Sequence, residues 1–318
     1  MPVDLVSRPR RRPVALVRWL VRENRVMTAS PDPRGEEPSS GVVAEGLPAG
    51  DEAEVPLPGG DVTDGVVRVG NTVRRPVGPH SWLVHEVLAH LDRVGFAGAP
   101  RFLGLDAQGR EVLTFVAGEV AGRPWPAWVA DEQRIASVAR LVRSYDDAVA
   151  TLAIPDPRAG TQVAAPVGMP ASIAGPAELL GHMDVTPENV VFRDSVAVAL
   201  IDFDLVRPAT RTEEVGNVLQ WWAPLMPIGD REPVLRDVDP LARATTLVDA
   251  YGLADPDRQL LVPVMLNAAD RTWHQMKHRA DHLGGGWRRM WDAGVGDRIL
   301  RRQEWLAVHA QELHDAVT

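Results

Sequence analysis

The 318-residue sequence has no cysteine, a single lysine and no apolar stretch long enough to cross a bilayer. Without cysteine there is no disulfide, no thiol nucleophile and no cysteine-ligated zinc, which fits a reducing compartment. The sequence also lacks the G-x-x-x-x-G-K-[ST] loop of P-loop proteins and the G-x-S-x-G elbow of serine hydrolases. We therefore expect a cytoplasmic protein with no transmembrane segment that belongs to neither of these enzyme classes.

Residues 1–56 differ in composition from the rest of the chain. Residues 1–26 hold seven arginines against two acids, and residues 27–56 hold seven acids against one arginine and are rich in proline, glycine and serine. Such a segment lacks the apolar residues of a core, so we predict a disordered extension. Its basic start resembles a signal peptide, but Arg18 interrupts the apolar run and no cleavage site follows. A basic helix for a membrane surface and a start site assigned upstream of Met27 both remain open.

Charge divides the remaining chain into two parts. Residues 57–117 carry equal numbers of arginines and acids, whereas residues 118–318 carry −8 of the net charge of −9. An acidic surface repels the phosphates of duplex nucleic acid, which argues against nucleic acid as a partner. Because a chain of this length can form two cores, we predict two lobes with these boundaries.

The smaller predicted lobe has the pattern of a sheet with one helix. Short β-branched runs flank Gly70-Asn71, which favours a two-residue hairpin, and a second hairpin is predicted around Gln108-Gly109. Residues 81–95 place apolar side chains on one helical face and end at a glycine. Beyond residue 118, helical periodicity dominates in DEQRIASVARLVRSYDDAVATL, VGNVLQWW, ARATTLVDAYGL, DRQLLVPVMLNAADRTWHQMKHRADHL and RRQEWLAVHAQELHDAV.

One segment of the larger part, LLGHMDVTPENVVFRDSVAVALIDFD (residues 179–204), gathers a histidine, several carboxylates and an asparagine beside two strand-like runs. His182-x-Asp184 is followed by Asn189, and a predicted hairpin returns the chain so that Asp202 lies beside Asn189. Phosphoryl transfer needs such a set, because one Asp orients the nucleophilic hydroxyl while an Asn and a second Asp hold magnesium. Singly, each residue is explained as a turn, cap or core residue. Their order and spacing favour chemistry over coincidence.

With these motifs the chain resembles the aminoglycoside phosphotransferase family, which has a protein-kinase-like fold. The resemblance covers about residues 57–253 and includes RFLGLDAQGREVLTFVAGE, which is similar to the family's segment leading into the hinge. It implies an α+β, bilobal fold with a small sheet-plus-helix N-lobe and a larger, mainly helical C-lobe. It also implies that Asp184 is the catalytic base and that His182 supports its loop. Asn189 and Asp202 would then be the magnesium ligands.

The resemblance further implies a nucleotide site in the N-lobe. Gly59 and Gly60 fall where the family has its phosphate-covering turn, and Phe115 and Val116 fall where backbone groups meet adenine. Pro-Gly-Gly by itself is only a turn signal. The implied donor is ATP, with GTP as an open alternative, and the implied metal is Mg²⁺.

Two positions depart from the family pattern. Met183 stands where the family commonly has glycine, which an ordinary backbone angle there would tolerate. The lysine of the third strand is absent, and Arg74 is the predicted substitute for holding phosphates, with Glu86 as the only nearby helix acid. Alternatively, Arg74 and the adjacent Arg75 are solvated residues of an arginine-rich chain.

Two further groupings have simpler interpretations. His274, His278 and His282 share a helix face at a spacing that can bind metal, but no carboxylate ligand accompanies them, so a polar face is favoured. Glu213 and Glu214 open a helix, where acids suit the helix dipole. The family often has an Asp near Glu214, and capping is sufficient to explain both acids.

Together these patterns predict a small-molecule phosphotransferase that moves the γ-phosphate of ATP or GTP to an acceptor hydroxyl. The acidic larger lobe favours a cationic acceptor, such as an aminoglycoside-like or other hydroxylated amine. The alternative is a non-catalytic nucleotide-binding module with the same fold, which the missing lysine and Met183 would suit. The sequence does not predict the oligomeric state.

Overall fold

The computed structural model describes residues 53–57, 65–78, 80–155 and 166–318, which belong to one compact unit. The predicted extension therefore lies almost entirely outside the described residues. Its last part, however, contributes the short strand β1, Val55–Pro56, which pairs with β2. The sheet thus begins two residues before the predicted boundary at residue 57.

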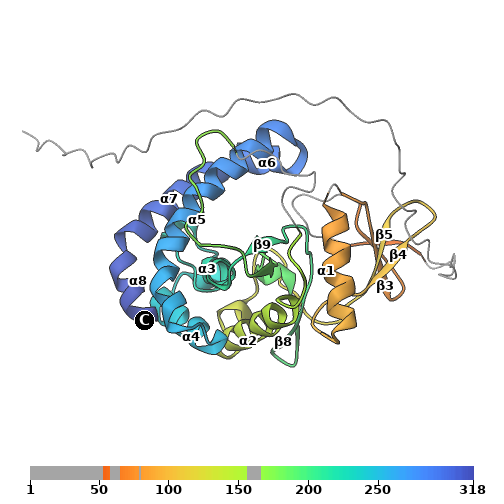
Figure 1. Cartoon of the computed structure of the whole chain (residues 1–318), viewed down its shortest axis with the longest axis horizontal. Helices are drawn as coiled ribbons and strands as arrows, with labels where there is room; N and C mark the ends of the chain where they lie inside the picture. The colour runs from red at the N-terminus through yellow and green to blue at the C-terminus, as the bar shows by residue number, and fades with distance from the viewer. Residues whose placement is uncertain (1–52, 58–64, 79, 156–165) are drawn as a thin grey trace, which may run out of the picture. The chain divides into compact units, whose positions relative to one another are not determined.

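The N-lobe is a five-stranded antiparallel sheet in the order β1-β2-β3-β5-β4, with helix α1 beside it (Figure 1). The bounds are β2 Val67–Val69, β3 Thr72–Arg75, α1 Ser81–Arg93, β4 Phe102–Leu105 and β5 Glu111–Thr114. Both predicted hairpins are confirmed, since β2 pairs with β3 and β4 with β5. The helix forms because Val84, Val87, Leu88 and Leu91 share one buried face.

The C-lobe is mainly helical, with two small two-stranded sheets, β6-β9 and β7-β8. Its strands are β6 Leu179–Gly181, β7 Val190–Arg193, β8 Val196–Leu200 and β9 Arg207–Ala209. Its α-helices are α2 Glu132–Val149, α3 Arg211–Trp222, α4 Pro240–Tyr251, α5 Asp255–His282, α6 Gly285–Asp292, α7 Val295–Val308 and α8 Ala310–Val317. Four 3₁₀ helices connect them, η1 Ala127–Ala130, η2 Pro187–Asn189, η3 Ile228–Asp230 and η4 Pro233–Leu235.

The long helix α5 organises the C-lobe, because it packs against α3 on one side and against α6, α7 and α8 on others (Figure 1). The last predicted helix is in fact two, α7 and α8, which meet at His309. Helix α6 was not predicted. Trp222, Tyr145 and Phe203 are among the largest fully or almost fully buried side chains of the core.

The segment between the lobes is fastened to the β7–β8 hairpin. Glu119 and Phe192 exchange two backbone hydrogen bonds of 2.8 Å. A Cβ at Gly118 would collide with the Val191 side chain and the Phe192 carbonyl, so only glycine allows this approach.

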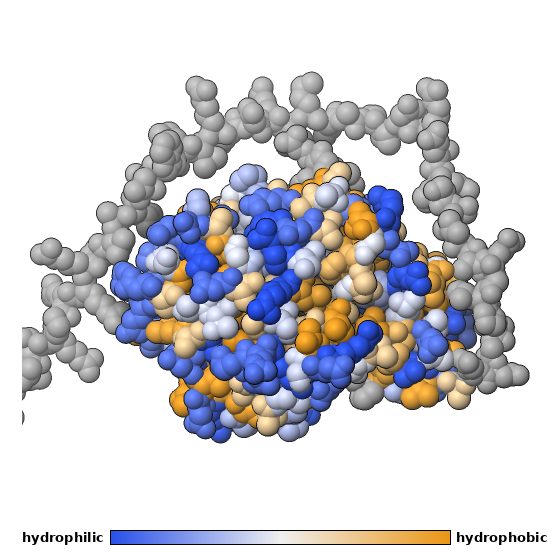
Figure 2. All heavy atoms as spheres, turned by 90° about the horizontal axis from the view of Figure 1, so that it is seen from below, coloured by the Kyte–Doolittle hydropathy of each residue, from blue (hydrophilic) through white to orange (hydrophobic). Residues whose placement is uncertain are grey.

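These features confirm the predicted α+β, bilobal architecture with a sheet-plus-helix N-lobe and a mainly helical C-lobe. On the face seen in Figure 2, hydrophilic and hydrophobic residues are interspersed. Within the part of the chain that the structure describes, no helix is both long and apolar enough to span a membrane.

Candidate active site

The predicted catalytic loop follows β6 directly. His182 is fully buried, its Nε2 lies 3.0 Å from the Ile201 carbonyl oxygen, and its Nδ1 accepts a 3.3 Å hydrogen bond from the Asp184 N–H. Burial lowers the pKa of His182 to about 4, so the imidazole is neutral. A neutral ring with both nitrogens engaged supports the loop and holds Asp184 in place.

Asp184 and Asn189 lie in direct contact. The Asn189 Nδ2 group donates to the Asp184 Oδ2 and to its carbonyl oxygen, each at 2.9 Å. The hairpin β7–β8 then returns the chain so that the Ile201 N–H donates to the Asn189 carbonyl at 2.9 Å. The structure therefore brings Asp202 beside Asn189 as the spacing predicts.

Asp202, two residues after the end of β8, lies in a turn and has a backbone conformation that is rare for a non-glycine residue. Asp202 has a φ of +61°, a left-handed conformation that typically costs a non-glycine residue about 1–2 kcal/mol. The next residue, Phe203, is buried, and its ring centroid lies 4.6 Å from that of His182. Phe203 thereby anchors the turn to the catalytic loop, with Asp202 on one side and Asp204 on the other.

Acids gather around Asp184 without an equal number of cations. Burial, together with the charges of Asp202, Glu188 and Asp204, raises the pKa of Asp184 to about 7. Burial and the charge of Asp204 likewise raise the pKa of Asp202, against the lowering effect of Arg75. The site thus has an excess of carboxylates that a bound cation would offset.

The cation from β3 that faces this site is Arg75, and the prediction of Arg74 is wrong in its placement. Arg75 Nη1 lies 3.3 Å from Asp202 Oδ1, and its Nη2 donates to Asp204. Arg74 instead lies 3.8 Å from Asp106. Successive strand residues point to opposite faces of the sheet, so only one of the two can reach the acids.

The predicted partner Glu86 is also not the acid that supports this arginine. Glu86 is exposed, whereas Glu111 on β5 is buried and lies 3.7 Å from Arg75 Nε. Helix α1 contributes through Ser81, whose hydroxyl donates to Glu111, and through His85 at 3.5 Å. Burial by itself would raise the pKa of Glu111, but the hydrogen bonds from His85 and Ser81 and the charge of Arg75 lower it overall.

The remaining predicted nucleotide residues are placed only in part. Gly59 and Gly60 lie outside the described residues. The Phe115 N–H donates to the Asn71 carbonyl at 2.8 Å, and the Arg68 guanidinium covers the Phe115 ring at 3.8 Å from its centroid. The half-buried Val116 makes no backbone hydrogen bond to another described residue, which leaves its peptide groups for a ligand.

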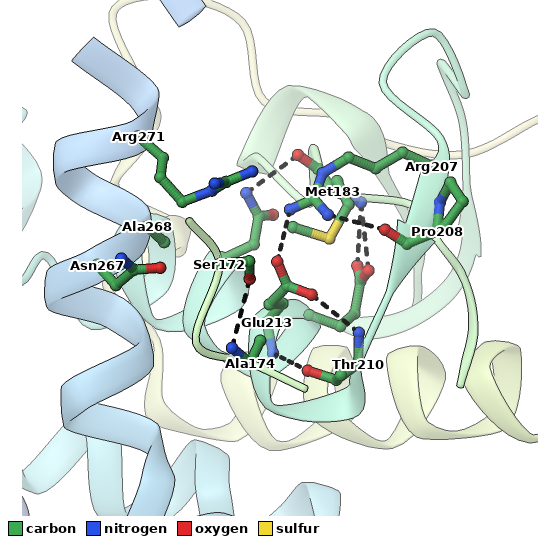
Figure 3. Close-up of polar contacts among 12 residues, drawn as sticks. Ser172, Ala174, Met183, Arg207, Pro208, Thr210, Glu213, Asn267, Ala268 and Arg271 are labelled. Carbon is green, nitrogen blue, oxygen red and sulfur yellow. Dashed lines mark hydrogen bonds and ion pairs between the residues drawn. The ribbon is translucent and has the colours of Figure 1, made fainter. Parts of the chain in front are cut away.

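Met183 does not have the ordinary backbone angle under which it would readily replace the family's glycine, because its φ is +59°. Two side chains from α3 hold this peptide. The Met183 N–H donates to both Glu214 carboxylate oxygens at 3.2 and 3.3 Å, and Asn217 Nδ2 donates to the Met183 carbonyl at 3.1 Å (Figure 3). The Val185 N–H donates to Asn217 Oδ1 at 2.9 Å, so α3 clamps the loop on both sides of Asp184.

Glu213 and Glu214 therefore have different roles. Glu213 completes a capping box with Thr210, as capping predicted. Glu214 is fully buried and accepts hydrogen bonds from the Met183 N–H, and burial together with the charge of Asp146 raises its pKa well above the usual value. The sequence signal for this clamp is the spacing of Glu214 and Asn217, which share one face of α3.

The histidine stripe on α5 does not form a metal site. His278 and His282 stack with ring centroids 4.1 Å apart, and His274 lies 3.7 Å from Asp270. Among the described residues, no group of three or more His, Cys, Asp or Glu is arranged to hold a metal ion alone.

Comparison with known proteins gives one relative in sequence and several in structure. No protein-family model matches the chain. The trifolitoxin immunity protein of Rhizobium leguminosarum bv. trifolii is 31% identical over 221 residues, which are 68% of this chain and 80% of that protein.

Among solved structures, a choline/ethanolamine kinase family protein from Mesorhizobium loti matches with a TM-score of 0.51 and 16% identity, over 85% of this chain and 92% of that chain. An ethanolamine kinase from Plasmodium vivax matches with a TM-score of 0.51 and 10% identity, over 84% and 83%. Two aminoglycoside phosphotransferase structures also match, with TM-scores of 0.48 and 0.49. At such low identity, the two matches with a TM-score of 0.51 show the fold alone, and they confirm the kinase-like fold that the sequence resemblance implied.

Proposed function

The chain belongs to the family of the trifolitoxin immunity protein and has a protein-kinase-like fold, and from these premises we propose that it is a phosphotransferase. It would transfer the γ-phosphate of ATP, or of GTP, to a hydroxyl of a small molecule. The observation that carries the proposal is the convergence of Asp184, Asn189 and Asp202. The side chain of Arg75 is hydrogen-bonded to Asp202 and to Asp204 at the same place.

The donor atoms suit magnesium. Carboxylate and amide oxygens are the ligands that Mg²⁺ prefers, and Mg²⁺ in kinases takes further ligands from the nucleotide phosphates, so a complete protein cage is not required. Burial and the negative charges of neighbouring carboxylates raise the pKa values of Asp184 and Asp202, and such a cation would offset this excess of negative charge. Asn189 and Asp202 would hold the ion, which when bound would offset the negative charge of the transferred phosphoryl group.

The protein residues would divide the remaining work. Asp184 would accept or orient the proton of the acceptor hydroxyl, a role that a pKa near neutrality suits. His182 and the Glu214–Asn217 clamp would hold Asp184 in position. Arg75 would turn from Asp202 and Asp204 toward the nucleotide phosphates, to which its guanidinium can donate two hydrogen bonds.

The family relationship adds a possible biological setting. The relative is named for immunity to trifolitoxin. If a toxin were the acceptor, its phosphorylation would provide immunity by chemical modification, and this is a second candidate role for the same reaction.

A phosphotransfer screen tests the proposal against the alternative of a non-catalytic nucleotide-binding module. The purified chain would be incubated with Mg²⁺ and either ATP or GTP, together with hydroxylated amines, hydroxy acids, sugars and antibiotics, and nucleotide consumption would be measured. An enzyme consumes nucleotide only with its acceptor and loses this activity in Asp184→Asn. Nucleotide binding without consumption for any acceptor would instead support the module.

The charge of the acceptor is a separate question. The net charge of the C-lobe favours a hydroxylated amine, but arginines of β9 and α5 lie on one side of the catalytic loop.

A further inference from the structure

Three arginines of the C-lobe converge beside the catalytic loop. Arg207 is in β9 and pairs in register with Gly181, two residues before Met183. Arg271 and Arg279 are on α5, about two turns apart and on the same side of that helix. Figure 3 shows Arg207 and Arg271 reaching toward one another from opposite sides of Met183.

The charges of these residues act on one another. Burial lowers the pKa of both Arg271 and Arg279, and the positive charge of Arg207 lowers each further. Asp184 has the opposite effect on Arg279, whose pKa its negative charge raises. Arg279 is therefore close enough to Asp184 for their charges to interact.

Few acids balance this cluster. Arg207 lies 3.2 Å from Glu213, whereas Arg271 donates to the Pro170 carbonyl and Arg279 stacks over Trp287, 4.5 Å from the ring centroid. Neither α5 arginine forms an ion pair with another residue that the structure describes. The neighbouring Glu214 is engaged by the Met183 N–H.

Helix α5 also binds the chain segment that contains Pro170, Ala171 and Ile173. Asn267 Nδ2 donates to the Ala171 carbonyl at 3.0 Å, and the Ile173 N–H donates to Asn267 Oδ1 at 3.3 Å. Together with the contact of Arg271 to Pro170, these bonds pin the segment 170–174 to α5. The cations are thus held on built structure, with guanidinium N–H groups left over for a ligand.

We propose that Arg207, Arg271 and Arg279 bind an anionic group of the acceptor, a carboxylate or a phosphate, and so present its hydroxyl to Asp184. The inference rests on the proposed phosphotransferase function and specifies its substrate class. All three arginines come from the C-lobe, whereas the cation for the nucleotide phosphates, Arg75, comes from the N-lobe. A planar guanidinium matches a carboxylate or phosphate with two parallel hydrogen bonds, which favours these anions over a neutral sugar or an amine.

Matched acceptors test the charge requirement. Serine would be compared with ethanolamine, which lacks the carboxylate, and glycerol 3-phosphate with glycerol, which lacks the phosphate. We expect phosphotransfer to, or binding of, the anionic member of at least one pair, and the two pairs distinguish a carboxylate from a phosphate. Preference for ethanolamine and glycerol would overturn the proposal and leave the phosphotransferase function intact.

Substitutions test the residues. Arg279→Ala and Arg271→Ala should each raise the KM, or the Kd measured by titration calorimetry, for the anionic compound by about 10–100-fold. The affinity for Mg-nucleotide should not change. Arg279→Lys should recover part of the affinity lost in Arg279→Ala, because lysine keeps the positive charge but cannot donate two parallel hydrogen bonds. Arg288→Ala, which removes an exposed arginine of α6, is the matched control and should behave as wild type.

The readouts separate the two hypotheses. If no compound is phosphorylated but glycerol 3-phosphate or serine binds and loses affinity in Arg279→Ala, the phosphotransferase function fails and the anion site stands. If these variants weaken nucleotide binding instead, the cluster serves the nucleotide and the inference is wrong. Thermal melting of each variant excludes loss of folding as the cause.

Discussion

The two sides of the catalytic loop carry opposite charges. Acids exceed cations on the N-lobe side, and arginines exceed acids on the side of α5. On the N-lobe side, one cation, Arg75, lies among Glu111, Asp202 and Asp204. On the side of α5, the three arginines form one ion pair with an acid among the described residues, that of Arg207 with Glu213. Unbalanced charge at a partly buried site is unfavourable, and under our proposals a ligand of the opposite sign would offset it on each side. The difference indicates that a divalent cation belongs on one side and an anionic acceptor on the other.

The largest effect is expected at Asp184, which lies between the two sides. Asp184→Asn should lower the phosphotransfer rate by about 10²–10⁴-fold, because the amide cannot accept the hydroxyl proton. Calorimetry should show nucleotide affinity nearly unchanged, whereas Asp202→Ala should lose both activity and Mg-dependent nucleotide affinity. Asp194→Asn, in the exposed turn between β7 and β8, is the control. A fully active Asp184→Asn enzyme would remove the basis for the assigned role.

The next effect distinguishes the two arginines of β3. Arg75→Ala should weaken nucleotide binding by about tenfold or more, because the guanidinium is the cation nearest to the predicted phosphate site. Arg74→Ala should have little effect on nucleotide affinity, since its side chain lies with Asp106 on the other face. Titration of ATP into both variants measures the difference. Equal effects would mean that the N-lobe side does not use Arg75 for the nucleotide.

A third test concerns Asp146, a buried acid of helix α2. Burial raises the pKa of Asp146 to about 7, and this residue accepts a hydrogen bond from Tyr251. A carboxyl whose pKa is raised on folding stabilises the protein fully below about pH 4, and this contribution is lost as the pH rises through about 7. The free energy of unfolding of wild type, relative to Asp146→Asn, should therefore fall by up to about 1.4 kcal/mol per pH unit in that window.

Urea unfolding between pH 5 and pH 8 measures this slope. The adjacent Asp147→Asn is the control, because Asp147 is exposed and paired with Arg143 and Arg211. Identical slopes for wild type and Asp146→Asn would show that Asp146 is ionised in the folded protein.

The smallest effect concerns Glu213, which caps α3 and balances Arg207. Glu213→Gln should lower the free energy of unfolding by about 0.5–1 kcal/mol and should also lower the KM for an anionic acceptor, because it removes the carboxylate that is ion-paired with Arg207. Thr210→Ala removes the same cap and leaves the charge, so it should cost about 1 kcal/mol with no change in KM. A change in KM in both variants would show that the effect is structural.

The catalytic loop and hairpin could be predicted because their geometry is local. Asp184, Asn189 and Asp202 are separated only by a short loop and two strands, so spacing and periodicity were sufficient to bring them together. The choice between Arg74 and Arg75 was not predictable in this way. A shift of one residue turns every side chain of a strand to the other face, and the register depends on pairing with β5.

The remaining errors involve contacts over long sequence separations. The backbone angle of Met183 is held by Glu214 and Asn217, which lie 31 and 34 residues away. The sign of charge beside the loop depends on Arg207 and Arg271, which only the packing of α5 brings together. The net charge of −8 for residues 118–318 is a sum over the whole lobe and does not predict the charge around one site.

The fastening of Glu119 to Phe192 determines where the molecule can bend. Glu119 is bonded to the hairpin that follows Asn189, and the Ala117 carbonyl accepts a hydrogen bond from Arg193 of the same hairpin, so we expect a hinge between the lobes to lie before Ala117. Closing at such a hinge would move Arg75 relative to Asp202 while the arrangement of Asp184 and Asn189 stayed rigid. Nucleotide capture and acceptor alignment would then be mechanically independent, with one achieved by motion of the N-lobe and the other built permanently into the C-lobe.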